Sequence, residues 1–239
     1  MHRRCSIARL IILIAGAISG CESSIPSTPT VTPPVRVVTT LSAQPFVRAA
    51  TDRSVTGPTS FVITVAASQP DLLDSVSHES VVGVTLYIPN GTSLWATPLA
   101  DESIAVIVHP ANAIGDLTLA QVRDAFAGRA PEWAAATREE GDDSRMAFEA
   151  LALNGLKPAA TTILAPSPET MLKFVSGTPN GIGFAPLRWV NETVKVVAIE
   201  GKRPGEEGYA LNTLIVAVAK EEPTGAAREW LAKLQSAQP

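Results

Sequence analysis

The chain contains few of the residues that build disulfides, metal sites and aromatic clusters. Its 239 residues include two cysteines, three histidines and only 5% aromatic residues. The histidines do not show the spacing of a metal site, and the sequence has no nucleophile elbow, phosphate-binding loop or dinucleotide fingerprint. We therefore expect no enzymatic activity, no bound metal and no cofactor.

Long apolar runs are also missing, with one exception near the start. Leu10 to Ile18 is an unbroken apolar or small stretch, but a membrane-spanning helix needs about 20 such residues. It follows a basic start formed by Arg3, Arg4 and Arg9. A basic segment followed by a short apolar one is typical of a secretory signal peptide. The sequence therefore predicts export.

The residues after the apolar run indicate where the signal peptide ends. Ile18-Ser19-Gly20-Cys21 resembles the bacterial lipobox, whose cysteine is lipidated and becomes the new N-terminus. This resemblance implies a signal peptide over residues 1–20. It also implies an acyl (palmitate) anchor on Cys21, at the extracytoplasmic face of the cell membrane. Cys5 would be removed, so Cys21 has no partner for an intrachain disulfide. An ordinary signal peptide that ends near a cysteine is the alternative.

Acidic residues outnumber basic ones, by 23 to 19. Loss of the three arginines in the signal peptide leaves a charge of about −7. Such acidity argues against nucleic acid or an anionic membrane face as a partner. It leaves room for a locally basic pocket that binds an anion.

Residues 21–34 consist largely of Ser, Thr and Pro. This composition offers too little apolar surface to fold, and the prolines keep the segment extended. We interpret it as a tether between membrane and domain, with an interaction tail as the alternative. Residues 35–239 are long enough to form a core without disulfides, as one large or two small lobes.

Beyond the tether, β-branched apolar stretches alternate with helix signals. Strands are expected at Val35–Thr40, Phe61–Val65, Val81–Ile88, Ile104–Val108, Ile182–Ala185, Val194–Ile199 and Leu214–Ala219. Thr118 and Gln121 form a capping box, and Gly128 stands where that helix would end. Further helices begin at Ser167-Pro168 and after Thr224. The alternation predicts an α/β fold with mostly parallel sheets flanked by helices.

Four segments occur in an order that is typical of one family. They run from Ile104 to Trp133, from Arg138 to Glu149, from Thr178 to Phe184 and from Tyr209 to Leu234. In this order the chain resembles the phosphate-type periplasmic (solute-)binding proteins of the PBP-like superfamily. The resemblance implies a type II fold of two lobes, with a ligand between them and closure about a hinge. Lobe 1 would comprise about 35–106 and 195–239, and lobe 2 about 107–194.

The family places anion-binding donors after the strands of lobe 1. After the first expected strand this chain has Thr40 and Ser42, whose hydroxyls can donate or can equally cap the next helix. Ser68 follows the second strand, where the family has a turn rich in glycine and serine, and capping a helix is its alternative role. Thr85-Leu86-Tyr87 follows the third strand, where the family has an acidic acceptor that reads the phosphate proton.

The most informative segment of the expected site is 138–145. The family pattern is an arginine, three residues, and then Ser-Gly-Thr opening a helix. Arg138 and Ser144 stand at the arginine and threonine positions, and Arg145 matches an arginine that is common after the triplet. Asp142 and Asp143 replace the serine and the glycine.

The two aspartates change what this helix start can bind. A carboxylate there is itself an anion at the end of the helix that attracts anions. Asp142 could cap the helix, and a second anion about 4 Å away would be repelled by roughly 4 kcal/mol. The aspartates could also neutralise Arg138 and Arg145 as a structural ion-pair cluster.

Two functions follow from this resemblance. The first is a lipoprotein that captures phosphate or a similar small oxyanion, as a monomer that delivers it to an ABC-type permease. The second is a degenerate domain with an altered ligand or none, which acts as a sensor or a surface interaction module. An extracytoplasmic hydrolase would need a catalytic constellation, which the sequence does not show. The expected ligand-binding residues are Thr40, Ser42, Ser68, Arg138, Asp142, Asp143, Ser144 and Arg145.

Overall fold

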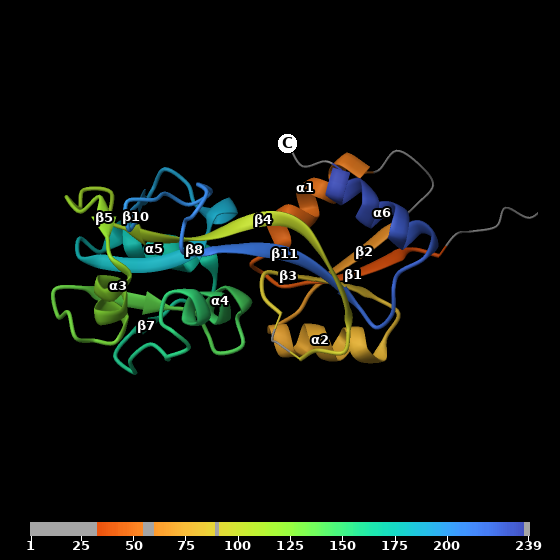
Figure 1. Ribbon diagram of the computed structural model, residues 1–239, viewed down its shortest axis with the longest axis horizontal. Coiled ribbons are helices and arrows are strands. Elements are labelled where there is room, and N and C mark those ends of the chain that lie inside the picture. Colours follow the sequence, from red (N-terminus) through yellow and green to blue (C-terminus); the bar gives the residue numbers. More distant parts are fainter. Residues whose placement is uncertain (1–32, 55–59, 89–90, 237–239) are drawn as a thin grey trace, which may run out of the picture. The chain divides into compact units, whose positions relative to one another are not determined.

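Residues 33–54, 60–88 and 91–236 are described in the computed structural model. The predicted signal peptide (1–20), the predicted anchor Cys21 and the predicted tether up to residue 32 lie outside the described residues. Within the described ranges, no helix is long and apolar enough to cross a membrane. These ranges form two lobes that share a pair of long strands (Figure 1).

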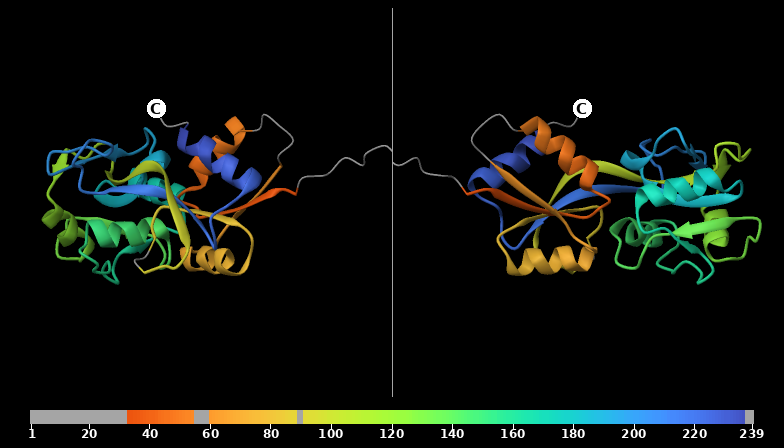
Figure 2. Two further views of the ribbon diagram at one scale, coloured as in Figure 1. Left: turned by 45° about the vertical axis from the view of Figure 1, so that its right-hand side comes forward. Right: turned by 180° about the vertical axis from the view of Figure 1, so that it is seen from behind.

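Lobe 1 is a sheet with helices on both faces (Figure 2). Its parallel strands are β1 (Val35–Thr39), β2 (Phe61–Val65) and β3 (Val82–Thr85). Its helices are α1 (Gln44–Ser54), α2 (Gln69–His78) and α6 (Gly225–Ser236). Because successive strand residues point to opposite faces, Val37 joins the core cluster with residues of α1 and α6, and Val38 joins the cluster with residues of α2. Both faces of β1 are therefore buried.

Lobe 2 has a parallel sheet of its own. Its strands are β6 (Ala134–Thr137), β7 (Ile163–Leu164) and β8 (Gly181–Pro186), and its helices are α3 (Leu119–Phe126), α4 (Asp143–Leu151) and α5 (Pro168–Gly177). Phe148 of α4 stacks on Phe184 of β8 with 4.1 Å between ring centroids, and Phe126 of α3 meets Phe148 edge-on at 4.7 Å. Such aromatic contacts are directional. They fix α4, whose first turn carries several of the predicted site residues.

Two strands connect the lobes, as Figure 1 shows. β4 (Trp95–Val108) pairs antiparallel with β11 (Asn212–Ala219) as far as Ser103, and with β8 from Ile104 onward. The strand order is β2-β1-β3-β11-β4-β8-β6-β7. The register of β11 against β4 shifts between Ile215 and Val216, and such a bulge bends a strand pair. The lobes are therefore connected by a pair of hydrogen-bonded strands.

The predicted α/β fold, with mostly parallel sheets flanked by helices, is confirmed, with β4 and β11 as antiparallel members. The capping box is present at α3: Thr118 accepts from the backbone N–H of Gln121, whose side chain accepts from the backbone N–H of Thr118. Gly128 follows this helix with a φ of 70°. Ser167 caps α5 as predicted. A 3₁₀ turn, η1 (Leu187–Trp189), follows β8.

Other elements differ from the sequence prediction. β4 begins at Trp95, nine residues before the predicted start at Ile104. The sequence prediction missed its first half because Pro98 and two acidic residues interrupt the apolar pattern there. The predicted strand Val194–Ile199 is divided into β9 (Lys195–Val196), which pairs with β4, and β10 (Ala198–Ile199), which pairs with β5 (Asp116–Leu117). These residues, assigned to lobe 1 from the sequence, therefore pair with strands of lobe 2.

Candidate functional site

A cavity of about 270 Å³ lies where the loops after β1 and β2 meet the turn between β6 and α4. Of the predicted residues, Thr40, Ser68, Arg138, Asp142 and Asp143 line it. The first two come from lobe 1 and the other three from lobe 2. The structure thus brings the two halves of the predicted site together, and the binding role of these residues stays a prediction.

Asp143 joins the two lobes at this cavity through three hydrogen bonds. It begins α4 and is 1% exposed. Its Oδ2 accepts hydrogen bonds from Thr40 Oγ1 at 2.6 Å, from Thr85 Oγ1 at 3.0 Å and from the backbone N–H of Leu86 at 2.7 Å. All three donors belong to lobe 1, so the carboxylate sits among donors of the kind that an oxyanion requires.

Burial raises the pKa of Asp143. The negative charge of Asp142 raises it further, and the hydrogen bonds from Thr40 and Leu86 lower it by less. The carboxyl group therefore keeps its proton to a higher pH than an ordinary aspartic acid. The buried hydroxyl of Ser42 also faces this carboxyl group and lowers its pKa by less.

Asp142 caps α4, which confirms one of the alternatives drawn from the sequence. Its Oδ1 accepts from the backbone N–H of Arg145 at 3.1 Å and from the hydroxyl of Ser144. Its Oδ2 accepts from Arg138 Nη2 at 2.5 Å. Asp142 therefore uses the helix amide, the hydroxyl and part of the guanidinium that the resemblance assigns to a bound anion.

The two arginines have different partners. Arg138 is 3% exposed, donates from Nη1 to the carbonyl of Ala165 at 2.8 Å, and has an Nε without a partner. Arg145 donates from Nε to Glu149 at 2.6 Å and from Nη1 to the carbonyl of Arg138 at 2.9 Å. The predicted ion-pair cluster therefore holds for Arg138 and Asp142. Arg145 pairs with Glu149, and neither arginine is hydrogen-bonded to Asp143.

Ser68 has the helix-capping role that was its alternative. Its hydroxyl accepts from the backbone N–H of Asp71 at 3.3 Å and donates to the Asp71 carboxylate at 2.7 Å. The next residue, Gln69, lines the cavity, is 1% exposed, and its Oε1 has no partner. Its backbone N–H donates to the carbonyl of Gly141 in lobe 2 at 2.8 Å.

Sequence reasoning missed the roles of Thr85 and Leu86. The segment after β3 was interpreted as lacking an acidic group. The structure places an acidic group there, but it comes from Asp143 in the other lobe. The available signal was the pair of unexpected aspartates at the start of α4, together with two hydroxyl residues at the ends of β1 and β3.

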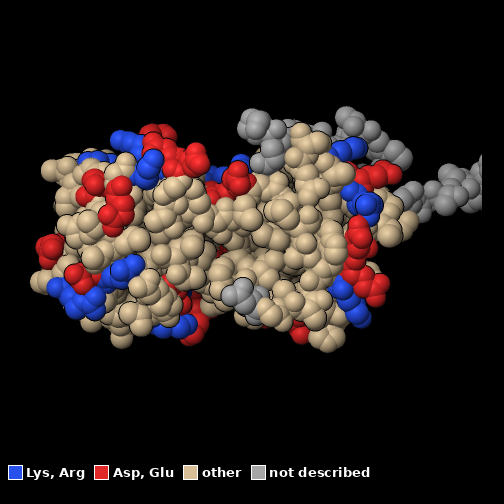
Figure 3. Space-filling model, viewed as in Figure 1, with Lys and Arg blue, Asp and Glu red and all other residues tan. Residues whose placement is uncertain are grey.

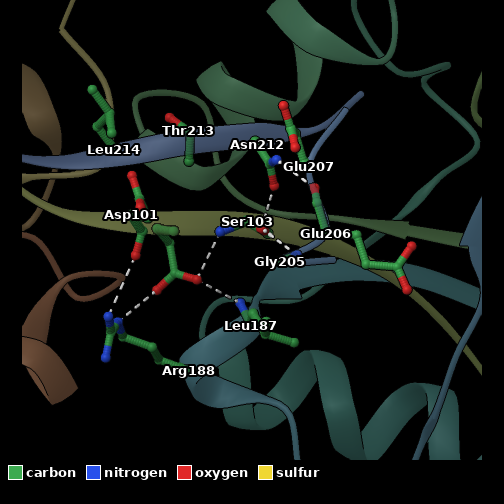
Figure 4. A pocket seen from close by; sticks show the side chains of 11 residues that line it. Asp101, Ser103, Leu187, Arg188, Gly205, Glu206, Glu207, Asn212, Thr213 and Leu214 are labelled. Atoms are coloured by element: carbon green, nitrogen blue, oxygen red, sulfur yellow. Dashed lines mark hydrogen bonds and ion pairs between the residues drawn. The ribbon is translucent and has the colours of Figure 1, made fainter. Parts of the chain in front are cut away.

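A larger cavity of about 690 Å³ lies beside β4 and β11, the two strands that connect the lobes (Figure 4). At its wall, the buried carboxylate of Glu102 in β4 accepts from the backbone N–H groups of Ser103 at 2.9 Å and Leu187 at 3.1 Å. Arg188 Nε lies 3.2 Å from the same carboxylate. Burial raises the pKa of Glu102, and these partners lower it by less. The guanidinium of Arg188 lies 5.4 Å from the ring centre of Phe46 in α1. Glu102 thus holds η1 against the connecting strand β4, and Arg188 also contacts α1 of lobe 1.

The face shown in Figure 3 has no large surface patch of a single charge sign. Basic and acidic side chains alternate at both ends of that face, and its middle carries few of either. Within the described ranges, no group of three or more His, Cys, Asp or Glu side chains is placed to hold a metal ion.

Among known proteins, only solved structures resemble this chain, and the resemblance is one of fold. No family profile and no curated protein sequence matches the chain. A Clostridium perfringens protein assigned as a phosphate ABC transporter substrate-binding protein, solved with bound phosphate, matches with a TM-score of 0.76 and 22% identity, over 84% of this chain and 93% of that one. An ABC-type phosphate transport receptor from Vibrio cholerae matches with a TM-score of 0.70 and 19% identity, over 85% and 94%.

Regulatory domains share this architecture as well. The CcmR regulatory domain of Synechocystis, solved in complex with 2-PG, matches with a TM-score of 0.65 and 12% identity, over 84% of this chain and 95% of that domain. Fold similarity of this kind is compatible with several functions. The matches confirm the two-lobe architecture that the resemblance implied.

Proposed function

From the fold of phosphate-type periplasmic binding proteins, we propose that the chain is a lipid-anchored, extracytoplasmic solute-binding protein. Its ligand is a small oxyanion such as phosphate, which enters the 270 Å³ cavity between the lobes. As a monomer, it delivers that solute to an ABC-type permease. Cys21 is the anchor, and residues 21–34 are the tether to the membrane.

The observation that carries this proposal is a set of buried polar atoms without partners around the cavity. Arg138 Nε is an unpaired donor, and Asp143 Oδ1 and Gln69 Oε1 are unpaired acceptors. Each such atom costs about 1–3 kcal/mol when it stays unpaired. A protonated oxyanion supplies an acceptor oxygen for the Arg138 donor and an O–H group that donates to one of the two acceptors. Phosphate, which is protonated at neutral pH, has this chemistry.

Glu139 and Glu140 also line the cavity, but they are exposed, so the buried carboxyl group of Asp143 has the largest effect on a bound anion. An ionised carboxylate about 4 Å from the anion would repel it by roughly 4 kcal/mol. Because burial raises the pKa of Asp143, a bound anion and this carboxyl group can share a proton. This sharing removes the repulsion and replaces it with a hydrogen bond.

A second candidate function is a sensor or surface interaction module without a small-molecule ligand. It is favoured by the three lobe 1 donors that Asp143 already occupies and by the capping of α4 by Asp142. In this case the cleft is satisfied by its own side chains.

Titration calorimetry of the chain from Glu22 onward, with phosphate, sulfate and molybdate, distinguishes the two functions. We expect saturable binding of phosphate that is lost in Arg138→Ala and kept in Arg129→Ala. Arg129 is a matched control because it pairs with Asp124 on the surface of lobe 2. No heat with any of the three anions, from a chain shown to be folded, would overturn the oxyanion function and leave the second candidate.

A further inference from the structure

We propose that Asp143 is an internal ligand of the cleft: its carboxylate takes the position of a solute anion and holds the two lobes together when no solute is bound. This inference goes beyond the proposed function, because it concerns the chain without solute. It holds or fails independently of whether phosphate binds.

The convergence of donors on one oxygen is the first argument. Thr40 follows β1, and Thr85 and Leu86 lie at the end of β3, so the donors come from two separate segments of lobe 1. All of them meet Asp143 Oδ2, at 2.6 to 3.0 Å. Helix α4, which carries Asp143, is held in lobe 2 by its aromatic contacts. One carboxylate oxygen thus links three donors of one lobe to the framework of the other.

The environment of Asp143 is the second argument. A buried carboxylate is costly unless it is paired or hydrogen-bonded. The nearby arginines give Asp143 no such pairing, because Arg138 is bound to Asp142 and Arg145 to Glu149. The hydrogen bonds from lobe 1 are therefore its compensation. When the lobes separate, water must replace those hydrogen bonds. The side chain of Asp143 therefore stabilises the closed arrangement by the difference in free energy between its bonds to lobe 1 and its bonds to water.

Further contacts join the lobes without completing the closure. The backbone N–H of Gln69 donates to the carbonyl of Gly141 at 2.8 Å, and the indole N–H of Trp189 donates to the carbonyl of Ser42 at 3.0 Å. These two are single neutral hydrogen bonds, which are about half as strong as those to a charged group. Arg188 of η1 adds charged contacts with Glu102 and with the ring of Phe46, but they lie beside the strands that connect the lobes and outside the cavity lined by Asp143. We therefore expect loss of the Asp143 carboxylate to shift the balance toward the open form.

The internal ligand has a direct chemical consequence. If Asp143 is shortened to alanine, the donors of Thr40, Thr85 and Leu86 lose their acceptor, and a space the size of a carboxylate is left between the lobes. A small anion from solution that binds these donors in place of the deleted carboxylate should then restore the closed form. Acetate is the appropriate probe, because it carries the deleted group, and phosphate is the second probe.

The experiment is small-angle scattering and thermal unfolding of the chain from Glu22 onward, in a chloride buffer without other anions. For Asp143→Ala we expect a larger radius of gyration than for the wild type and a melting temperature lower by about 5 °C or more. Added acetate or phosphate should restore both values. Asp143→Asn should open less than Asp143→Ala, because its amide oxygen can accept the same bonds but without the charge that strengthens them. Asp124→Ala, in the surface ion pair of lobe 2, should behave as the wild type.

Three outcomes would overturn the inference: an unchanged radius of gyration and melting temperature in Asp143→Ala, an Asp124→Ala that opens equally, or an opened Asp143→Ala that neither anion closes. Should Asp143→Ala not fold, Thr85→Val removes one donor from the lobe 1 side at nearly constant volume. It should shift both values in the same direction by less, and no shift would reject the internal ligand. Calorimetry of the wild type tests the oxyanion function separately, so either proposal can fail alone.

Discussion

Gly83 lies in β3, where α2 packs closely on the sheet of lobe 1. A Cβ atom at this position would lie 2.6 Å from Cγ2 of Val218 and 2.8 Å from Cδ2 of Leu72 and Cγ2 of Val76. All three neighbours are fully buried. None can move away without disturbing the core, because protein interiors are close-packed.

We expect Gly83→Ala to lower the free energy of unfolding by about 1–3 kcal/mol, since the added methyl group overpacks this contact. Urea unfolding of the two chains measures the difference. Gly177→Ala is the matched control, because a Cβ there meets nothing within 4 Å, and such a surface change stays within about 0.5 kcal/mol. Equal effects of the two substitutions would contradict the close contact.

The residues of the candidate site show what sequence can and cannot give at this scale. The residue types that bind anions at strand and helix ends were visible at Thr40, Ser68 and Arg138, and all three line one cavity. The partners of Asp143 were not visible. Thr85 is 58 residues away in the chain, and only the packed fold shows that the two side chains meet.

At the scale of elements, those with strong local signals were predicted closely. Helices α3 and α5 have capping residues whose hydrogen bonds depend on four consecutive residues, and both begin where expected. The first half of β4 has no such signal. Pro98 and Glu102 interrupt its apolar pattern, and its strand conformation depends on pairing with β11, more than 100 residues later. Long-range pairing of this kind leaves little trace in a local pattern.

Glu102 of β4, which accepts from the backbone of Leu187 and lies beside Arg188, is expected to make the stability of the folded chain depend on pH. Burial raises the pKa of Glu102 above the ordinary value of 4.5. The stabilisation from this group is therefore complete below pH 4.5, and it is lost as the pH rises through the raised pKa. Each unit by which the pKa is raised corresponds to about 1.4 kcal/mol.

Glu102→Gln removes this titration. We expect the stability of the wild type relative to Glu102→Gln to fall as the pH rises from 4.5 into the neutral range. Urea unfolding of both chains across that range measures the difference at each pH. A difference that is the same at every pH would show that the carboxyl group of Glu102 does not titrate differently in the folded chain.

At the scale of the whole molecule, the order of motifs carried the fold prediction. No single segment was decisive, but four in sequence matched one architecture, and the structural matches confirm it. The sharing of β4 and β11 explains why order matters. The chain must enter lobe 2 along one strand and return along its neighbour, so the segments of lobe 2 lie between two parts of lobe 1.

The predicted anchor is tested on the whole chain in a bacterial host. Cys21→Ser should move the protein from the membrane fraction to the soluble extracytoplasmic fraction and abolish incorporation of labelled palmitate, because the acyl chains need the thiol. Cys5→Ser, within the predicted signal peptide, should change neither. Retention of Cys21→Ser in the membrane at the wild-type level would reject the lipobox.

Trp189 gives the junction between the lobes an optical property. Its half-buried indole ring lies in η1 and donates to the carbonyl of Ser42 in lobe 1 at 3.0 Å. Indole emission moves to longer wavelength when the ring becomes hydrated, so separation of the lobes should red-shift the fluorescence emission of Trp189. The emission wavelength of Trp230, which is 2% exposed in the core of lobe 1, should not change. The chain therefore carries its own fluorophore where the lobes meet, and its opening can be followed without an attached dye.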